Sequence, residues 1–284
     1  MEIWFMPVIA VVNRKGGSGK STLATHLAAW LAAQGMAVML GDVDRQQSTR
    51  AWLRRRSPTL PAIVPWAMDE KNVLKAPPGV THVVLDTPGG MRGFELAKVV
   101  MSADAIIIPV CNSMFDRESA SACVAELMAL PRVASGRCRI GLVGMRIDAR
   151  TRAAEVLREW AKALHVPFLG VLRETQLYVR SLENGQTVFD LPVSVNGADQ
   201  QQWEPILEWL QVFARAPLPL RTGTGIGSAR AASLMPAQEV LVHGSRLAAA
   251  QDTDAVQPAN TTEPFDAPRF LLREARNPTQ NVLI

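Results

Sequence analysis

The feature that most constrains this chain is a glycine-rich stretch that lies between an apolar segment and a helical pattern. Residues 8–12 are all apolar or small and predict a buried strand. The sequence Lys15-Gly-Gly-Ser-Gly-Lys-Ser-Thr22 follows, and leucines at positions 23, 27 and 31 then recur at helical spacing. Strand, glycine loop and helix in this order form the context that a phosphate-binding loop requires.

This loop has the chemistry to hold a polyanion. Three glycines let backbone N–H groups turn inward around phosphates without Cβ clashes, and the helix N-terminus adds partial positive charge at the same point. Lys20 would place its ammonium group on the outer phosphates, and Ser21 would offer its hydroxyl group to Mg²⁺. The flanking strand and helix disfavour the alternative of a chance turn. The predicted nucleotide-binding residues are Gly16, Gly17, Ser18, Gly19, Lys20, Ser21 and Thr22.

The rest of the first 216 residues alternates between strand and helix patterns. Continuous apolar runs predict further strands at 37–41, 82–86, 105–110, 139–145 and 166–172. Helical periodicity predicts helices over 21–34, 117–130, 151–164 and 199–215. Residues 57–79 are proline-rich and are expected to be irregular, and Arg54–Arg56 are expected to form a solvated helix end. Buried strands that alternate with helices predict an α/β fold: a doubly wound, mostly parallel sheet with helices on both faces.

Acidic side chains follow two of the predicted strands. Asp86 ends one of them, where it would hold Mg²⁺, with a simple turn cap as the alternative. Asp42 and Asp44 follow another, and because side chains alternate along an extended segment, both point to the same side. Ligand groups of a parallel sheet belong at the carboxyl ends of its strands, so Lys20, Asp44 and Asp86 are expected to share one site.

Composition narrows the class of protein. Hydrophobic residues make up 48% of the 284 residues, enough for a sizeable core. No apolar run approaches the roughly 18 residues that a membrane span needs. Cys111, Cys123 and Cys138 have no Cys-x-x-Cys spacing, so we expect neither a disulfide framework nor a zinc site, and a reducing cytosol suits them. The N-terminus lacks the basic region and cleavage site of a signal peptide, and none is expected.

The character of the chain changes after residue 216. Residues 217–284 show no sustained period and hold six basic and six acidic side chains, so the formal net charge of +4 belongs to the first 216 residues. This modest excess permits a polyanionic partner without establishing one. We predict a nucleotide-binding domain over residues 1–216 and a largely disordered tail over residues 217–284.

The loop resembles that of the ParA/MinD family of deviant Walker A ATPases, because a second lysine, Lys15, opens it. The sequence Asp86-Thr-Pro-Gly89 also matches a pattern of that family, and the resemblance covers about residues 7–213. It implies that the ligands are ATP and Mg²⁺ and that the chain forms a homodimer with ATP between its subunits. Lys15 is then the lysine that reaches the nucleotide of the partner subunit.

The resemblance implies roles for the other polar residues as well. Ser21, Asp42 and Asp86 are the implied metal ligands, and Asp44 positions the attacking water beside Lys15 and Lys20. Arg45 stands where the family has proline, so the loop is expected to be less rigid. Arg146 follows the predicted strand at 139–145, where the family binds adenine.

ParA-type members bind nonspecific DNA as ATP dimers. The matching segment offers Arg173 and Arg180, with Arg215 further on, as phosphate contacts, and solvated charges on a helix face are the alternative. The resemblance implies a cytoplasmic, nucleoid-associated protein that positions or partitions a plasmid, a chromosome locus or a protein cargo. A partner protein would stimulate its slow hydrolysis of ATP.

Two rival functions fit the same loop. A MinD-like switch binds membranes through a basic amphipathic helix, and residues 269–276 carry only a short, mixed-charge version of one, so membrane binding is not expected. A metabolic ligase with the same kind of loop needs a substrate pocket beside the phosphates, and no motif in the sequence indicates one.

Overall fold

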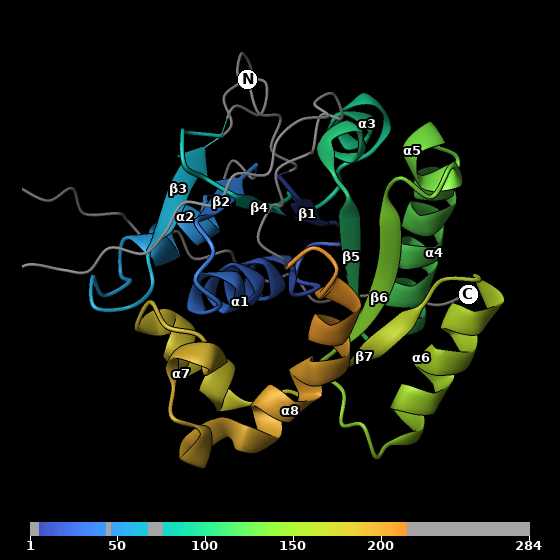
Figure 1. Cartoon of the computed structure of the whole chain (residues 1–284). Coiled ribbons are helices and arrows are strands. Elements are labelled where there is room, and N and C mark those ends of the chain that lie inside the picture. The colour runs from blue at the N-terminus through green and yellow to red at the C-terminus, as the bar shows by residue number, and fades with distance from the viewer. Residues whose placement is uncertain (1–5, 44–46, 68–75, 215–284) are drawn as a thin grey trace, which may run out of the picture. The chain divides into compact units, whose positions relative to one another are not determined.

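Seven parallel strands form one sheet in the computed structural model, which describes residues 6–43, 47–67 and 76–214 (Figure 1). The strand order is β3-β2-β4-β1-β5-β6-β7, and neighbouring strands pair in parallel throughout. The strands are β1 (Val8–Val11), β2 (Val38–Asp42), β3 (Ile63–Ala67), β4 (His82–Asp86), β5 (Ala105–Val110), β6 (Arg139–Met145) and β7 (Phe168–Leu172). The predicted parallel α/β architecture is confirmed.

Helices cover both faces of this sheet, and a separate apolar core lies under each set. One face carries α1 (Lys20–Ala33), α2 (Ser48–Leu53), α7 (Gln176–Glu183), the 3₁₀ helix η1 (Val188–Asp190) and α8 (Val193–Leu210). The other carries α3 (Gly93–Ser102), α4 (Met114–Met128), α5 (Pro131–Ala134) and α6 (Arg152–Ala163). Strands buried on both faces explain the continuous apolar runs in the sequence.

The strand order places the predicted site. From β1 the chain moves to β2 and β3 on one side, returns to β4, and then crosses β1 to reach β5, β6 and β7 on the other side. The direction of winding therefore reverses around β1. In open α/β sheets, ligands bind outside the carboxyl ends of the strands at such a reversal. The glycine loop begins where β1 ends, at this point of the sheet.

The expectation that residues 57–79 are irregular is wrong for part of that range. Residues 63–67 form β3, which pairs only with β2 at one edge of the sheet in the part of the chain that the structure describes. Pro65 lies within this strand. An edge strand tolerates proline because one side of its backbone has no ladder hydrogen bond to make.

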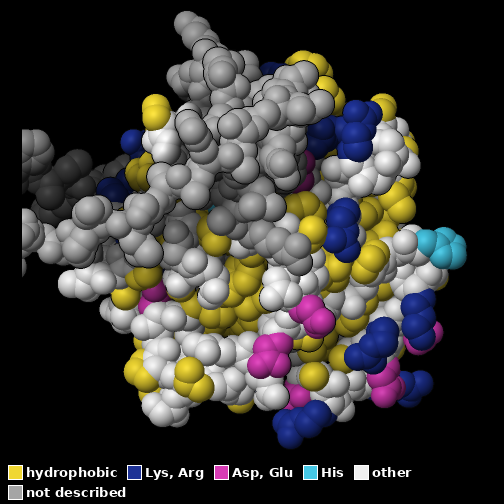
Figure 2. All heavy atoms as spheres, viewed as in Figure 1, with side chains coloured by type: hydrophobic (Ala, Val, Ile, Leu, Met, Phe, Trp, Pro, Cys, Tyr) yellow, Lys and Arg dark blue, Asp and Glu magenta, His cyan; other side chains and the backbone are white. Residues whose placement is uncertain are grey.

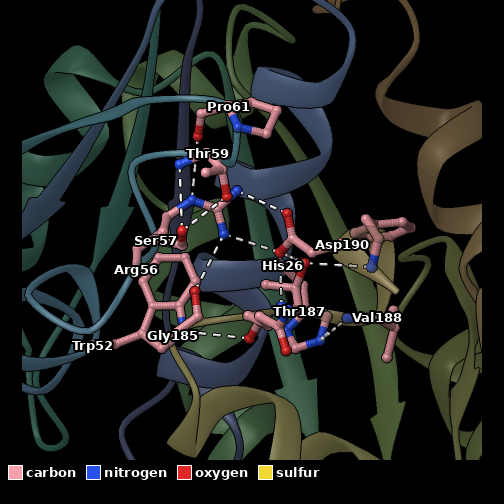
Figure 3. Close-up of polar contacts among 12 residues, drawn as sticks. His26, Trp52, Arg56, Ser57, Thr59, Pro61, Gly185, Thr187, Val188 and Asp190 are labelled. Carbon is pink, nitrogen blue, oxygen red and sulfur yellow. Dashed lines mark hydrogen bonds and ion pairs between the residues drawn. The ribbon is translucent and has the colours of Figure 1, made fainter. Parts of the chain in front are cut away.

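The prediction that Arg54–Arg56 are solvated is also wrong for Arg56. Its side chain is only 5% exposed and pairs with Asp190, with Nη2–Oδ1 and Nη1–Oδ2 distances of 2.8 and 2.9 Å (Figure 3). Arg56 also donates to the backbone oxygen of Gly185 and lies over the ring of Trp52. Arg54 and Arg55 are exposed, as predicted. The partner of Arg56 is more than 130 residues away, so local sequence could not reveal this ion pair.

His26 joins α1 to the elements around η1. It is fully buried, and its ring stacks on that of Trp203, with centroids 5.2 Å apart. Its Nδ1–H donates to the Thr22 carbonyl oxygen at 2.7 Å, and its Nε2 accepts from the Val188 N–H at 3.3 Å (Figure 3). This arrangement uses both ring nitrogens of the neutral imidazole. Burial is the main reason why the pKa of His26 lies at about 4.

We expect His26 to make the stability of the protein depend on pH. Between pH 6.5 and about 4 the unfolded chain binds a proton on this side chain that the folded protein does not. The stabilisation is therefore complete above pH 6.5 and is lost as the pH falls towards 4, by up to about 3 kcal/mol. Urea denaturation across this range measures the free energy of unfolding.

Two variants separate His26 from other titrating groups. His26→Gln should remove this part of the pH dependence, whereas the exposed His165→Gln should retain it. The same pH dependence in natural protein and His26→Gln would contradict the prediction.

Candidate nucleotide site

The glycine loop adopts a conformation that only its glycines accept easily. Gly17 and Gly19 have φ angles of 72° and 100°, in the left-handed region. A Cβ atom on Gly19 would lie 2.7 Å from Cε of Met145, at the end of β6. The Lys20 ammonium donates to the Lys15 carbonyl oxygen at 3.0 Å, so its side chain folds back over the loop.

Several groups of this loop are suited to phosphate. The first turn of α1 holds no acidic residue, and its N-cap, Gly19, supplies no side-chain hydrogen bond, so the helix N-terminus keeps its positive potential. Ser18 Oγ is buried and has no hydrogen-bond partner among the described residues. A Cβ atom at Gly16 or Gly17 would meet only open space, so the backbone faces a free volume. These residues fit a bound polyphosphate.

A second loop supports the first through one side-chain bond and one backbone bond. Thr87 Oγ1 donates to the carbonyl oxygen of Val11 at 2.7 Å, and the Gly90 N–H donates to that of Arg14 at 2.6 Å. A Cβ atom on Gly89 would lie 3.2 Å from the Gly16 nitrogen. The segment after β4 therefore packs directly on the glycine loop, which explains the small residues in Asp86-Thr-Pro-Gly-Gly90.

The two described acids of the predicted metal site lie side by side. Asp42 and Asp86 are paired positions on β2 and β4, and both are buried. Asp42 has an additional role that the sequence did not reveal: its Oδ2 accepts hydrogen bonds from the Thr49 N–H, the Thr49 hydroxyl group and the Arg50 N–H. The carboxylate thus caps the start of α2.

The remaining predictions for this site are not tested by the structure. Asp44 lies outside the described residues, so its predicted role in positioning water stays a prediction. The described residues contain no group of three or more His, Cys, Asp or Glu side chains that could hold a metal ion. Mg²⁺ suits such a site, because it is commonly held by one or two carboxylates, substrate phosphates and water.

Lys15 forms an ion pair within its own subunit. Its Nζ lies 2.5 Å from Oδ1 of Asp116, on the first turn of α4, and the Ser113 hydroxyl group donates to Oδ2 at 2.5 Å. Burial raises the pKa of Asp116, but the hydrogen bonds from Lys15 and Ser113 outweigh it, so the pKa lies below its ordinary value. Asp116 was missed from the sequence, where Ser113 and Asp116 show only the spacing of a helix cap.

Arg146 lies close to the glycine loop, but no hydrogen bond or ion pair joins it to the loop among the described residues. It is exposed and adopts a φ of 59°, and it directly follows Met145, which packs against Gly19. A left-handed conformation at a non-glycine residue is uncommon. Its predicted contact with adenine stays a prediction.

The arginines predicted to bind DNA have different surroundings. Arg173 makes a two-pronged ion pair with the buried Asp199, at 2.7 and 2.9 Å, which neutralises its charge. Arg180, on α7, is exposed. Arg215 lies outside the described residues.

The fold and this loop define a class: a parallel α/β protein with a phosphate-binding loop at the carboxyl end of its central strand. The model of the CobQ/CobB/MinD/ParA nucleotide binding domain matches residues 9–188, and the chain belongs to this family. The resemblance to ParA and MinD proteins inferred from the loop is confirmed.

Individual relatives support the same assignment. The maintenance of carboxysome distribution protein A of Halothiobacillus neapolitanus is 28% identical over 189 residues, 64% of this chain and 87% of that protein. Its namesake in Gloeobacter kilaueensis is 38% identical over 111 residues, 38% of this chain and about half (51%) of the relative. The structure of a Cyanothece McdA–ATP complex matches 75% of this chain and 98% of its own, with 16% identity and a TM-score of 0.58, and so shows the common fold.

We expect Asp116→Asn to strengthen the binding of ATP. The substitution removes a negative charge beside the loop and releases Lys15 from its ion pair, so a polyphosphate meets more positive potential. The dissociation constant should fall about fivefold, which corresponds to a gain of roughly 1 kcal/mol in the free energy of binding. Titration with a fluorescent ATP analogue measures it.

Glu159→Gln is the matched control, because Glu159 pairs with Lys162 on the exposed surface of α6. Its dissociation constant should equal that of the natural protein. Unchanged or weaker binding by Asp116→Asn would show that the Lys15–Asp116 pair does not oppose the nucleotide.

Proposed function

We propose that this protein is a ParA-like ATPase whose ATP-bound dimer binds DNA nonspecifically and positions a cargo. The observation that carries the proposal is the pair of lysines on one glycine loop, at the carboxyl end of β1, in a chain of the ParA/MinD family. Lys20 folds over the loop, whereas the Lys15 side chain is 40% exposed and turns away from the loop to Asp116 on α4. The two cations therefore suit two different phosphate groups.

Different residues of the proposed site would bind the phosphates, the magnesium ion and the nucleotide of the partner subunit. Backbone N–H groups of residues 16–22 cradle the phosphates, and Lys20 neutralises their charge. Ser21, Asp42 and Asp86 would hold Mg²⁺, which supplies further positive charge to the phosphates when bound. Lys15 is proposed to leave Asp116 and to pair with the phosphates of the nucleotide in the partner subunit.

Hydrolysis is proposed to depend on Asp44. This carboxylate would orient a water molecule in line with the outer phosphate, and positioning of this kind is the main task of a protein in phosphoryl transfer. The proposed reaction uses water, not a side chain, as the nucleophile. Turnover of ATP is expected to be slow. A partner protein would stimulate it and so release the dimer from DNA.

Two of the relatives suggest a protein cargo, although another is named as a chromosome-partitioning ATPase. The two are named for maintaining the distribution of carboxysomes, which are protein assemblies. We propose that this chain positions an assembly of this general kind, rather than a plasmid or a chromosome locus, on nucleoid DNA in the cytoplasm. We also propose that the ATPase domain spans residues 1–216, and the prediction for residues 217–284 falls outside the described residues.

Membrane attachment is the rival outcome. Every helix within the described residues is too short or too polar to span a lipid bilayer. A peripheral MinD-like attachment is distinguished by sedimentation with liposomes. Binding of the ATP form to liposomes but not to DNA would overturn our choice, and turnover that requires a small acid would instead indicate a ligase.

We expect two substitutions to separate nucleotide binding from hydrolysis. Lys20→Ala should abolish ATP binding, because it removes the cation that folds over the loop. Asp44→Ala should bind ATP and remain a dimer, since it retains the phosphate-binding groups and lacks the proposed water-positioning carboxylate. Light scattering with ATP measures the mass of each variant, and a persistent Asp44→Ala monomer would contradict the scheme.

DNA binding is expected to depend on Arg180. Reversal of this exposed charge in Arg180→Glu, alone or together with Arg173→Glu, should weaken the binding of an ATP-loaded dimer to nonspecific duplex DNA and lower its dependence on salt. Gel shifts at several salt concentrations measure both effects. Arg158→Glu, on the exposed surface of α6, is the matched control.

The double variant needs a stability check. Arg173→Glu leaves the buried Asp199 without its partner and should itself destabilise the fold. Arg180→Glu is therefore the decisive variant. If a folded Arg180→Glu protein shifts DNA like the control, the DNA surface lies elsewhere.

A further inference from the structure

Two adjoining hollows lie at the amino edge of the sheet, opposite the edge that carries the glycine loop. They have volumes of about 390 and 370 Å³, and Arg132 and Arg137 line both of them. The elements around them are the end of α3, α5 and the start of β6. In Figure 2, Lys and Arg side chains lie beside hydrophobic ones in the region of α3 and α5.

The first hollow is apolar apart from its two arginines. Leu130 and Pro131 line it together with Met101, whose surface is 70% exposed. Met101, Leu130 and Pro131 together give the hollow an apolar wall that an apolar side chain of a partner could cover. Methionine adapts its shape to a partner and is common on binding surfaces.

The second hollow carries a net positive charge, because three arginines line it together with Asp104 and the apolar Val212 and Phe213. Arg132 pairs with Asp104 at 3.0 Å, which leaves Arg137 and Arg139 without an ion pair among the residues that the structure describes. The Arg139 guanidinium lies over the Trp209 ring, 4.9 Å from its centroid. This stacking holds the side chain in place, so less conformational entropy is lost when it binds an anion.

The combination of the two hollows identifies the chemistry of the ligand. Nucleic acid would use the guanidinium groups but has no apolar side chain for the hollow beside Met101. A peptide carries both kinds of group within a few residues. We propose that these hollows bind a segment of a partner protein in which an apolar side chain lies next to carboxylates.

This surface is independent of the proposed nucleotide site. All the strands are parallel, so residues at the starts of β5 and β6 lie at the opposite edge from the loop that follows β1. A partner bound here would leave the glycine loop accessible. The inference thus goes beyond the proposed function and does not require DNA binding or ATP hydrolysis.

A peptide array tests the proposal with the full-length protein. Short peptides on a Gly/Ser background carry one leucine and up to three glutamates at every spacing, with Glu→Gln and Leu→Ser copies of each. We expect a subset of Leu/Glu peptides to bind and both kinds of copy to bind at least about tenfold more weakly by fluorescence anisotropy, since each loses one set of contacts.

Variants locate the binding surface. Met101→Asp and Arg137→Glu should each weaken the selected peptides about tenfold, and Arg158→Glu, an equal charge reversal on α6, should leave binding unchanged. Both altered side chains are exposed, so the fold should tolerate them. Circular dichroism checks this for each variant.

Three results would overturn the proposal. The first is that no Leu/Glu peptide binds better than its copies. The second is that folded Met101→Asp and Arg137→Glu bind the selected peptides as the control does. The third is that Arg137→Glu loses the binding of a nonspecific DNA duplex while Met101→Asp retains it, which would assign the hollows to nucleic acid.

Discussion

The close packing of two backbone loops is the constraint on which the site depends. The loop after β4 packs on the segment that ends β1 and begins the glycine loop, through the side-chain bond of Thr87, the backbone bond of Gly90 and the small separation at Gly89. The loops follow neighbouring strands, so the sheet register fixes their relative position. A shift of β4 by one residue would move Asp86 away from the glycine loop and turn its side chain to the other face.

The structure links this site to more distant elements through buried polar groups. His26 connects α1, which starts at the glycine loop, to η1 and α8. Arg56 connects the end of α2 to Asp190 of η1. Asp42, at the carboxyl end of β2, caps the start of α2. Buried groups of this kind are costly to leave unpaired, so the helices around η1 have a fixed position relative to the loop.

The sequence was sufficient for the features that depend on local pattern. The glycine loop, α1 and most strands follow from apolar runs and spacing, and the position of Asp86 follows from the end of its strand. Features that depend on distant partners could not be predicted. The Lys15–Asp116 and Arg56–Asp190 pairs join residues from separate elements, and β3 was missed because Pro65 is a poor strand former whose cost disappears only at a sheet edge. The ten-residue α3 was not predicted, because it is too short to show a clear helical period.

Pro65 also limits how two molecules of this protein can meet. A strand at the edge of a sheet offers amide and carbonyl groups that can template a strand of another chain, and Pro65 has no N–H to contribute to such pairing. Continuation of the sheet across β3 into a neighbour would leave a gap in the hydrogen-bond ladder. Contacts between two molecules are therefore more favourable on surfaces made of loops and helices. Aggregation by addition of strands along the β3 edge is less favourable.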